Sequence, residues 1–515
     1  MNDSCRPAPI SCDQSSLLYR LSAIPGLAEL GRRRGGTVSG VPPGALPLVA
    51  WWLRQTAGCS VLALTTEPEL VYSDALVWSG DDRPLLFPAG DTPSFDRVPP
   101  SEEVTRRRLG TLAALAECPP SLVVASPAGL VRPTLAVDHV RDGVLRLRSG
   151  DAVDREKLLA RLVALGYRRV AAVSSAGDFA VRGGIIDCFG LDATRPWRAE
   201  LVGDQIEELR AFDVAGQTSV NLLDSVAVWP ARELDLRPST VERAAAAVDA
   251  LDVDSCREDV REVWRRDRSR LDDGVYDEGM DLFFPYLQAE RPATLLDHLG
   301  TSAVVLFMGG RERILRAVTR HLDDVDKLRI QEEERGELPA GARTGLLAGP
   351  ELEGALSSLT CYDVVREAPD VTGAGSRIDL GWRGVDAFPG RFDLFADRVA
   401  EVTAGHGKTV VVLSRQQHRV EELAADRDMV SLDIAGFAAT AALPSAALVV
   451  SSPDISQGFA IDEAGLEVYT DHELFGVSKK RGSMLARGAR RAESTSARGS
   501  RRAARGRAAN DAFVI

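Results

Sequence analysis

Residues 39–46, Ser-Gly-Val-Pro-Pro-Gly-Ala-Leu, lie at a turn before a helical pattern, where a phosphate-binding loop could form. Such a loop has the pattern GxxxxGK[ST], because its backbone N–H groups bind phosphate, its lysine neutralises charge and its hydroxyl holds magnesium. With Gly44 as the second glycine, Ala45 and Leu46 stand where Lys and Ser/Thr are required, and two prolines remove backbone donors. The sequence therefore predicts a degenerate loop, including Gly40, Gly44, Ala45 and Leu46, that binds no nucleotide.

Two other segments imitate parts of a nucleotide site. Residues 405–409, Gly-His-Gly-Lys-Thr, resemble the end of a phosphate loop, but they precede an apolar strand pattern instead of following one. Residues 462–465, Asp-Glu-Ala-Gly, resemble an acidic magnesium box in a loop-like stretch, with no functional phosphate loop to serve. We interpret the first segment as a turn into a strand and the second as a surface loop.

Histidine and cysteine show no spacing typical of a catalytic or metal site. No Ser or Cys has a local nucleophile signature, and no cysteines form a CxxC pair. We expect no metal, no cofactor and no catalytic residue, so the chain alone is not expected to be an enzyme. The six histidines are at 139, 298, 321, 406, 418 and 472, and the seven cysteines at 5, 12, 59, 118, 188, 256 and 361.

A group of arginines follows strand-like sequence between residues 166 and 219. Residues of equal parity on a strand share a face, so these arginines could form a basic recognition surface. Alternatively, they form ordinary salt bridges with the acids of the same segment, each of which stabilises little. Spacing alone leaves both interpretations open. The arginines are Arg168, Arg169, Arg182, Arg198 and Arg210, and the acids Asp178, Asp187, Glu200, Asp204, Glu207 and Glu208.

The elements that position these arginines are four predicted strands and one helix. The strands cover Val170–Val173, Asp178–Cys188, Trp197–Val202 and Ile206–Phe212, which predicts a small antiparallel meander. The segment Arg155–Leu165 has an apolar stripe at helical spacing and ends at Gly166, so a helix is expected to pack on the sheet.

The remainder of the chain alternates strand and helix patterns, which predicts an α/β protein with parallel sheets. Helices are expected over Ser16–Leu30 and 45–56, and Ser239 with Glu242 forms a capping-box pattern for one long charged helix through Arg270. Buried strands are predicted at the following segments: Ser60–Thr65, Ser121–Ser126, Val304–Met308, Lys408–Leu413 and Ala447–Ser451.

Charge is distributed unevenly along the 515 residues. Residues 477–515 hold eleven Lys and Arg against two acids, which leaves 51 Lys and Arg against 73 Asp and Glu in residues 1–476. An acidic body argues against a broad nucleic-acid surface, whereas a basic arm could contact phosphate by itself or remain a solvated tail. No apolar run approaches the ~18 residues of a membrane span, and no signal-peptide core is present, so we expect a cytoplasmic protein.

Three stretches between residues 166 and 213 carry a specific pattern: GYRRV at 166–170, GDFAVRGGIID at 177–187 and WRAELVGDQIEELRAFD at 197–213. They resemble the UvrB-homology module of the transcription-repair coupling factor family of bacteria, often called Mfd. The segments LLFPAGDTPSFDRVPPSEEVTRRRL at 85–109, ATLLDHL at 293–299 and GFAIDEAGLEVYTDHELFG at 458–476 resemble other parts of the family.

This resemblance implies an N-terminal module that recruits the excision-repair protein UvrA to stalled RNA polymerase. In the implied order, a degenerate helicase-like (RecA-type) domain covers 16–139 and is completed by 221–345. A UvrA-binding domain at 140–220 is inserted into it, a third α/β domain covers 346–476, and a disordered basic tail covers 477–515. The resemblance assigns UvrA contact to Arg168, Arg169 and Arg182, with Phe189 a further candidate, and we expect non-specific DNA contact at Lys479, Lys480 and Arg481.

The sequence also departs from that family. Full-length members continue beyond the ELFG segment into a polymerase-binding domain and ATP-driven motor domains, for which no counterpart follows residue 476. Polymerase binding and translocation are therefore not expected of this chain unless those domains are supplied. Two alternatives remain open: a UvrB-like ATP-dependent DNA helicase component, which the missing lysine at 45 opposes, and a short protein that sequesters UvrA as a decoy.

Overall fold

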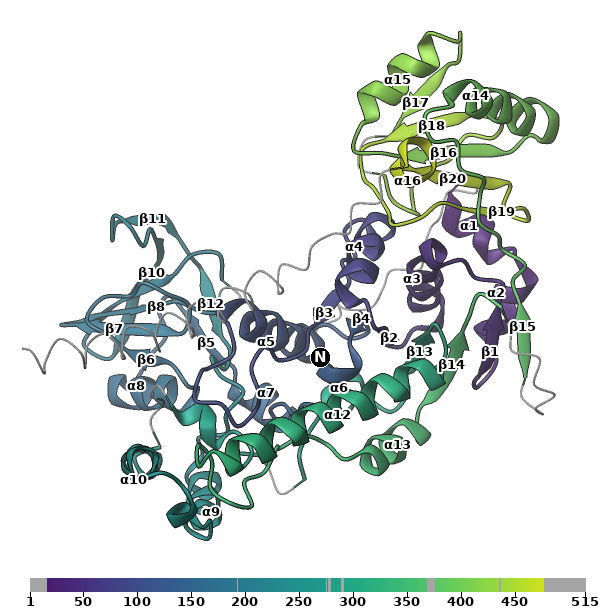
Figure 1. The fold of residues 1–515 in the computed structure, drawn as a ribbon. Coiled ribbons are helices and arrows are strands. Elements are labelled where there is room, and N and C mark those ends of the chain that lie inside the picture. The colour runs from purple at the N-terminus through teal and green to yellow at the C-terminus, as the bar shows by residue number, and fades with distance from the viewer. Residues whose placement is uncertain are drawn as a thin grey trace, which may run out of the picture. The chain divides into compact units, whose positions relative to one another are not determined.

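The computed structural model describes residues 16–476 except 192, 275, 277–278, 289–290, 368–375 and 435–436, and its first sheet has seven parallel strands (Figure 1). The strand order is β15-β1-β14-β13-β2-β4-β3. Strands β2, β4 and β13 are entirely buried, as expected for apolar parallel strands that are covered on both faces. The α/β prediction is confirmed at this level. The strands are β1 (Gly36–Ser39), β2 (Val61–Leu64), β3 (Leu85–Phe87), β4 (Leu122–Ala125), β13 (Val304–Met308), β14 (Thr360–Val364) and β15 (Arg377–Asp379).

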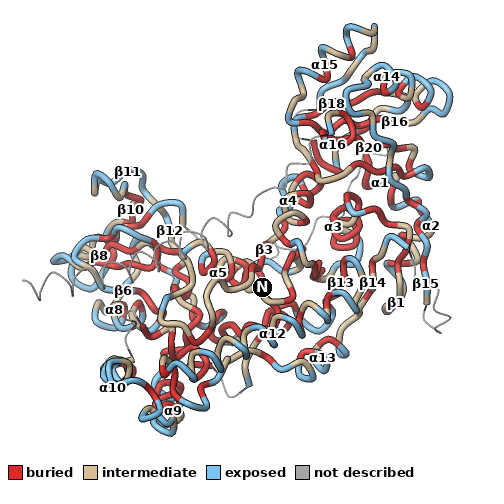
Figure 2. The backbone as a smooth tube through the Cα atoms, in the orientation of Figure 1, coloured by how far each residue is buried: buried red, intermediate tan, exposed pale blue. Residues whose placement is uncertain are grey.

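Helices cover both faces of this sheet. One face packs with α3 (Leu46–Ala57) and α4 (Pro68–Ser79) in a shared apolar core. The other face packs with α5 (Glu102–Glu117), α12 (Arg311–Glu334) and α13 (Gly349–Ser357) in a second core. Figure 2 shows the strands between them as buried chain.

Two of the predicted helices are each divided into two helices, and in both cases a proline begins one of the two. Instead of one entry helix over Ser16–Leu30, the structure has α1 (Leu17–Ser22) and α2 (Pro25–Leu30). Instead of one charged helix from the Ser239 capping box, α9 (Pro238–Asp249) and α10 (Glu258–Asp272) are separate. Pro238 occupies the first turn of α9 with Arg237 as N-cap, so Ser239 lies inside the helix and cannot cap it.

The segment with the arginines forms a six-stranded sheet of order β11-β10-β9-β8-β7-β6. The pairs from β7 to β11 are antiparallel, as in a meander, but the edge strand β6 is parallel to β7. The prediction of one strand over Asp178–Cys188 was wrong, because the chain turns at Gly183 and Gly184 and forms the hairpin of β7 and β8. The prediction of a strand at Val170–Val173 was wrong, because the strand is formed two residues earlier. The strands are β6 (Arg168–Arg169), β7 (Asp178–Arg182), β8 (Ile185–Cys188), β9 (Trp197–Val202), β10 (Gln205–Phe212) and β11 (Ser219–Leu222).

A two-stranded ribbon marks the points where the chain enters and leaves this sheet. Strand β5 (Leu145–Arg148) pairs antiparallel with β12 (Ser225–Val228), so that 149–224 form one excursion. Helix α8 (Arg155–Ala164) lies within it and is capped by the Asp154 side chain, which confirms the predicted helix.

A second sheet of five strands lies near the C-terminal end of the described residues, in the order β17-β18-β16-β20-β19. One face joins the core that also contains α3 and α4, and the other packs with α14 (Phe392–Ala400) and α15 (Gln417–Ala425). Strands β14 and β15 fall within the range 346–476 but belong to the first sheet. The strands are β16 (Thr409–Leu413), β17 (Ser431–Asp433), β18 (Leu448–Ser451), β19 (Phe459–Ile461) and β20 (Leu466–Thr470). None of the helices in the described part of the chain is long and apolar enough to span a bilayer.

Candidate partner-binding surface

The six-stranded sheet has one face in the core, and its opposite face is accessible only in part, because Ala180 and Asp187 on that face are buried. Phe179, Ile186 and Ala199, which alternate with the arginine positions, are buried in the core that includes α8. The strand register places Arg182, Ile185, Glu200 and Glu208 in one row across the opposite face. We call this the outer face of the sheet. It carries charges of both signs around a partly exposed isoleucine, so it is not a purely basic surface.

Strand β6 separates two of the predicted partner-binding residues. Arg168 pairs with Asp178 in the strand register, and its side chain forms a 3.1 Å ion pair with the buried Asp178 carboxylate. Arg169 pairs with the core residue Phe179, so it projects to the side opposite Arg168. Arg169 is exposed and forms no hydrogen bond or ion pair within the described residues. The two neighbours therefore cannot contact a partner through the same face.

Arg182 lies at the end of β7 on the outer face, where its guanidinium is exposed. It donates hydrogen bonds of 3.2 and 3.3 Å to the backbone carbonyl of Ala171 and has no ion pair among the described residues. Phe189 is half-buried and packs beside Val173, Ala180 and Phe212 in a small core. Arg182 is thus available to a partner, whereas Phe189 contributes to packing.

Arg198 and Arg210, which the sequence could not assign, form pairs within the sheet. Arg198 donates two hydrogen bonds of 2.7 and 2.9 Å to Asp187 and stacks 4.8 Å from the Phe212 ring centroid. The hydrogen bonds to Asp187 raise the pKa of Arg198 above its ordinary value. Arg210 pairs with Glu208 of its own strand. For these two arginines the salt-bridge interpretation is confirmed.

A β-bulge in β10 sets the spacing of the acids on the outer face. The register advances from Ile206 to Glu208 while β9 advances by only one residue, so Glu207 is the extra residue. Glu208 consequently lies directly opposite Glu200, and like charges in that position destabilise a sheet. Without the bulge Glu207 would lie opposite Glu200, and the sequence carried no signal that located the bulge.

The segment 39–46 is packed closely against other parts of the chain. It joins the end of β1 to α3, and a side chain at Gly44 would overlap the backbone carbonyl of Gln457. Gly40 adopts φ of +70°, and a Cβ there would overlap Asp379 and Gly381, while Ala45 is fully buried. The loop is therefore packed against chain from the second sheet and from the segment after β15.

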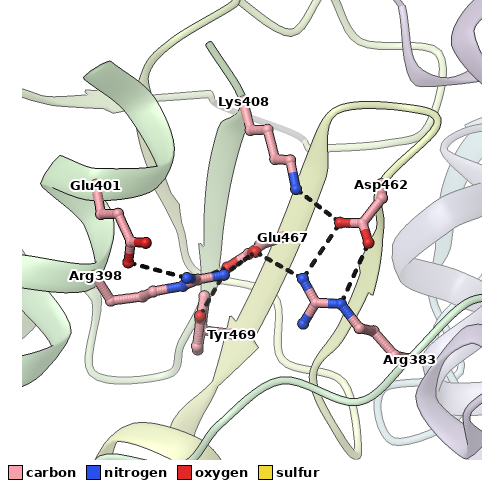
Figure 3. Close-up of polar contacts among 7 residues, drawn as sticks. All are labelled: Arg383, Arg398, Glu401, Lys408, Asp462, Glu467 and Tyr469. Atoms are coloured by element: carbon pink, nitrogen blue, oxygen red, sulfur yellow. Dashed lines mark hydrogen bonds and ion pairs between the residues drawn. The ribbon is translucent and has the colours of Figure 1, made fainter. Parts of the chain in front are cut away.

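The two segments that imitate a nucleotide site lie together in a charge network of the second sheet (Figure 3). Lys408 forms a 2.7 Å ion pair with Asp462, which also pairs with Arg383 at 3.2 Å. Asp462 occupies the turn between β19 and β20, and Lys408 precedes β16, as the turn and loop interpretations required. These groups neutralise one another.

Glu467 is the buried centre of that network. It is fully buried and accepts hydrogen bonds from Arg398 at 2.6 Å, Arg383 at 3.2 Å and the Tyr469 hydroxyl at 2.9 Å. Burial by itself would raise the pKa of Glu467, but the hydrogen bond and charge of Arg398, with the other donors, hold it below its ordinary value. The same burial and the nearby carboxylate raise the pKa of Tyr469.

The described residues contain no group of three or more His, Cys, Asp or Glu that could hold a metal ion. Lys479, Lys480 and Arg481, the predicted DNA contacts, lie outside the described residues.

Residues 145–234 match the family model of the UvrB interaction domain. The matched segment begins at β5 and ends just after β12, so it contains the ribbon and the whole six-stranded sheet. The resemblance to coupling factors is confirmed. Curated relatives extend it over most of the chain. A transcription-repair-coupling factor of Bacillus subtilis is 26% identical over 413 residues, which cover 76% of this chain and 34% of the relative.

Two further coupling factors show the same pattern. The protein of Myxococcus xanthus is 28% identical over 78% of this chain and 35% of its own length. That of Mycobacterium bovis is 30% identical over 59% of this chain and 25% of its own length. The chain thus spans about a third of the length of the first of these relatives.

Proposed function

We propose that this chain recruits UvrA in transcription-coupled nucleotide excision repair, as the corresponding region of a coupling factor. The observation that carries the proposal is the match of residues 145–234 to the UvrB interaction domain, since that segment coincides with a complete folded sheet. The similarity to transcription-repair-coupling factors over three quarters of the chain supports the repair context.

The outer face of the six-stranded sheet is the surface on which we place UvrA. The inner face is unavailable because it is buried against α8 and the body. Arg182 supplies an exposed guanidinium without an ion pair among the described residues, and Glu200 supplies a carboxylate, while the Glu208 opposite it is paired with Arg210. A partner with both acidic and basic side chains would complement this row, and charge complementarity favours specificity and fast association.

A titration of purified UvrA with this chain tests the proposal. Arg182→Glu should weaken binding by about 2–5 kcal/mol if the guanidinium becomes buried in the complex, and by less than ~1 kcal/mol if it stays at the rim. Arg168→Glu and Arg169→Glu distinguish the two sides of β6, because Arg168 shares a face with Arg182 and Arg169 does not. Arg146→Glu, on the exposed side of the ribbon, is the matched control. If all the sheet variants keep their fold and bind UvrA with unchanged affinity, UvrA does not bind this face.

The same proposal holds that the chain works without ATP. We regard the first sheet as a degenerate helicase-type domain, since Ala45 and Leu46 offer neither a cation nor a hydroxyl. The carbonyl of Gln457 also lies directly against Gly44, where it leaves no space for a side chain. Calorimetric titration with Mg-ATP should show no binding, and saturable binding lost on mutation of residues 39–46 would contradict this.

We also propose that the basic segment 477–515 contacts DNA. RNA polymerase binding would belong to domains of the coupling factors that lie outside the region similar to this chain. If roughly five cations of the basic segment contact duplex phosphates, log K should fall with log salt at a slope of about −4.5. Retained affinity after deletion of 477–515 would move the DNA site into the body. A cytoplasmic location agrees with these partners.

A further inference from the structure

A pocket with many apolar lining residues lies between α10, α12 and the segment 93–97, outside the residues that match the UvrB interaction domain. Its volume is about 430 Å³, within the range of roughly 300–1,000 Å³ that is typical of ligand sites. We call it the α10–α12 pocket. Four of its lining residues are buried members of one apolar core: Phe95, Trp264, Leu282 and Leu338.

The two helices also present apolar side chains to this pocket that are only half-buried. Val260, Val263 and Trp264 are spaced at i, i+3 and i+4 on α10, so they lie on one face of that helix. All three line the pocket, but Val260 and Val263 remain half-exposed beside the buried Trp264. Leu328 of α12 is half-exposed in the same pocket. A ligand that covered these aliphatic side chains would remove apolar surface from water, which favours binding.

The two guanidinium groups that line the pocket are already held in ion pairs. Arg97 pairs with the buried carboxylate of Asp267. Arg257 pairs with Glu337 at 2.7 Å and with Asp259 at 3.3 Å. An anionic ligand would have to compete with these carboxylates for both arginines, so the pocket does not favour one.

Four carboxylates line the pocket, and they are less fully engaged. Asp96 accepts a hydrogen bond from the backbone N–H of Val98 at 3.0 Å, but it forms no ion pair within the part of the chain that the structure describes. The side chain of Asp259 is 73% exposed and shares Arg257 with Glu337. The four are Asp96, Asp259, Glu332 and Glu337, which come from the segment 93–97, from α10, and from α12 with the residues after it. Carboxylates therefore reach the pocket from more than one side.

We propose that the α10–α12 pocket binds a peptide segment of a partner protein in which one large aliphatic side chain is flanked on both sides by Lys or Arg. The aliphatic side chain covers Val260, Val263 and Leu328, and the flanking cations meet the carboxylates of the three lining segments. Cations on both sides of an apolar group match this arrangement better than a small molecule with a single charge, because complementary charges fix the orientation of a ligand. The site gives the chain a second partner contact, made by residues other than those of the outer face of the six-stranded sheet.

A synthetic peptide tests the chemistry of the proposed ligand. The probe is a fluorescein-labelled heptapeptide of sequence Gly-Lys-Lys-Leu-Lys-Lys-Gly, titrated with the full chain and followed by fluorescence anisotropy. Replacing its leucine by serine should weaken binding by about tenfold or more, because the burial of one leucine side chain is lost. Replacing its lysines by glutamate should abolish binding. Equal affinity of the leucine and serine probes would show only general attraction to an acidic protein and would overturn the proposal.

Two matched pairs of variants test the place of binding. Val263→Lys fills the pocket and adds a positive charge, so it should weaken binding of the leucine probe as strongly as the loss of its leucine does. Ser269→Lys adds the same charge at an exposed position of α10 that does not line the pocket, and it should leave the affinity nearly unchanged. Asp96→Asn should weaken binding by up to about fivefold, as for an exposed ion pair, whereas Asp323→Asn at an exposed position of α12 should not. Equal effects of the two lysine variants would contradict the site.

A photoreactive leucine in the probe locates the site without any substitution in the chain, and it decides the question if Val263→Lys does not fold. After illumination, cross-links mapped by mass spectrometry should fall within residues 93–97, 257–264 and 328–338, which line the pocket. An excess of unlabelled leucine probe should suppress these cross-links, and the serine probe should not. Cross-links confined to other parts of the chain would overturn the proposal.

Discussion

Arg198 was a candidate recognition residue, but the structure gives it a structural role. It lies on the outer face, where its guanidinium forms an ion pair with Asp187, whose side chain is 1% exposed. Breaking a buried pair by removing one partner leaves an uncompensated charge. Asp187→Ala should therefore lower the free energy of unfolding by about 3 kcal/mol in urea titrations. Glu207→Ala, at the exposed bulge position, should change it by less than ~0.5 kcal/mol. A similar small effect at both sites would show that the Asp187 pair is not structural.

Glu467 gives a pH-dependent prediction at the same scale. Its folded-state pKa is below the unfolded value, so its contribution to stability is present above the unfolded pKa and is lost as the pH falls through the folded one. With an unfolded Glu pKa of roughly 4.3, the loss should begin below about pH 5. Glu467→Gln should flatten this part of the stability profile measured from pH 3 to 7. Glu353→Gln, at an exposed position of α13, should not alter the profile.

Residue types could be predicted from the sequence far better than residue pairings. The missing lysine and hydroxyl at 45 and 46 follow from the motif alone, whereas the contact of Gln457 with Gly44 joins positions more than 400 residues apart. In the same way, parity left open which arginines face a carboxylate, and only the strand register showed that Arg198 lies opposite Asp187 whereas Arg182 lies opposite Ile185.

Elements were predictable where a local signal fixed them. The apolar stripe and Gly166 defined α8, and the continuous apolar runs defined β2, β4, β13, β16 and β18 to within one residue at each end. Errors arose where two local signals competed. Ser239 resembled the N-cap of a capping box, but Pro238 before it already begins α9. Strand β6 forms at Arg168–Arg169, because these residues pair with β7.

The loop between β1 and α3 allows a test at the element scale. Gly44→Ala places a Cβ against the carbonyl of Gln457, where backbone must move, so the free energy of unfolding should fall by more than about 2 kcal/mol. Gly354→Ala, inside α13 with open space around it, should raise that free energy by up to ~1 kcal/mol. Denaturant titration measures both. Tolerance of alanine at 44 would mean that the loop is not packed as described.

At the scale of the whole described chain, the two parallel-type sheets share one apolar core. Val61 and Leu306 of the first sheet, and Val411 and Val468 of the second, belong to the same buried cluster. Asp74 of α4 is 1% exposed and accepts from the backbone N–H of Ser456 at 3.1 Å and from its hydroxyl at 2.5 Å. The indole of Trp78 packs 5.8 Å from both Phe437 and Phe459. Neither sheet can lose its structure without exposing apolar surface of the other.

Both sheets should therefore unfold in one cooperative step. In native-state hydrogen exchange, the slowest amides of β2 and β16 should report the same free energy of opening within about 1 kcal/mol, because both require global unfolding. Asp74→Ala leaves the partly buried backbone N–H of Ser456 without its carboxylate acceptor, at a cost of about 1–3 kcal/mol, and weakens only the contact between the sheets. In that variant the amides of β16 and β18 should exchange through an opening of lower free energy, while those of β2 should keep a higher free energy of opening. In the unmodified chain, the free energy of opening of the β16 amides could instead be several kcal/mol below that of the β2 amides. That result would show that the shared core does not couple the sheets.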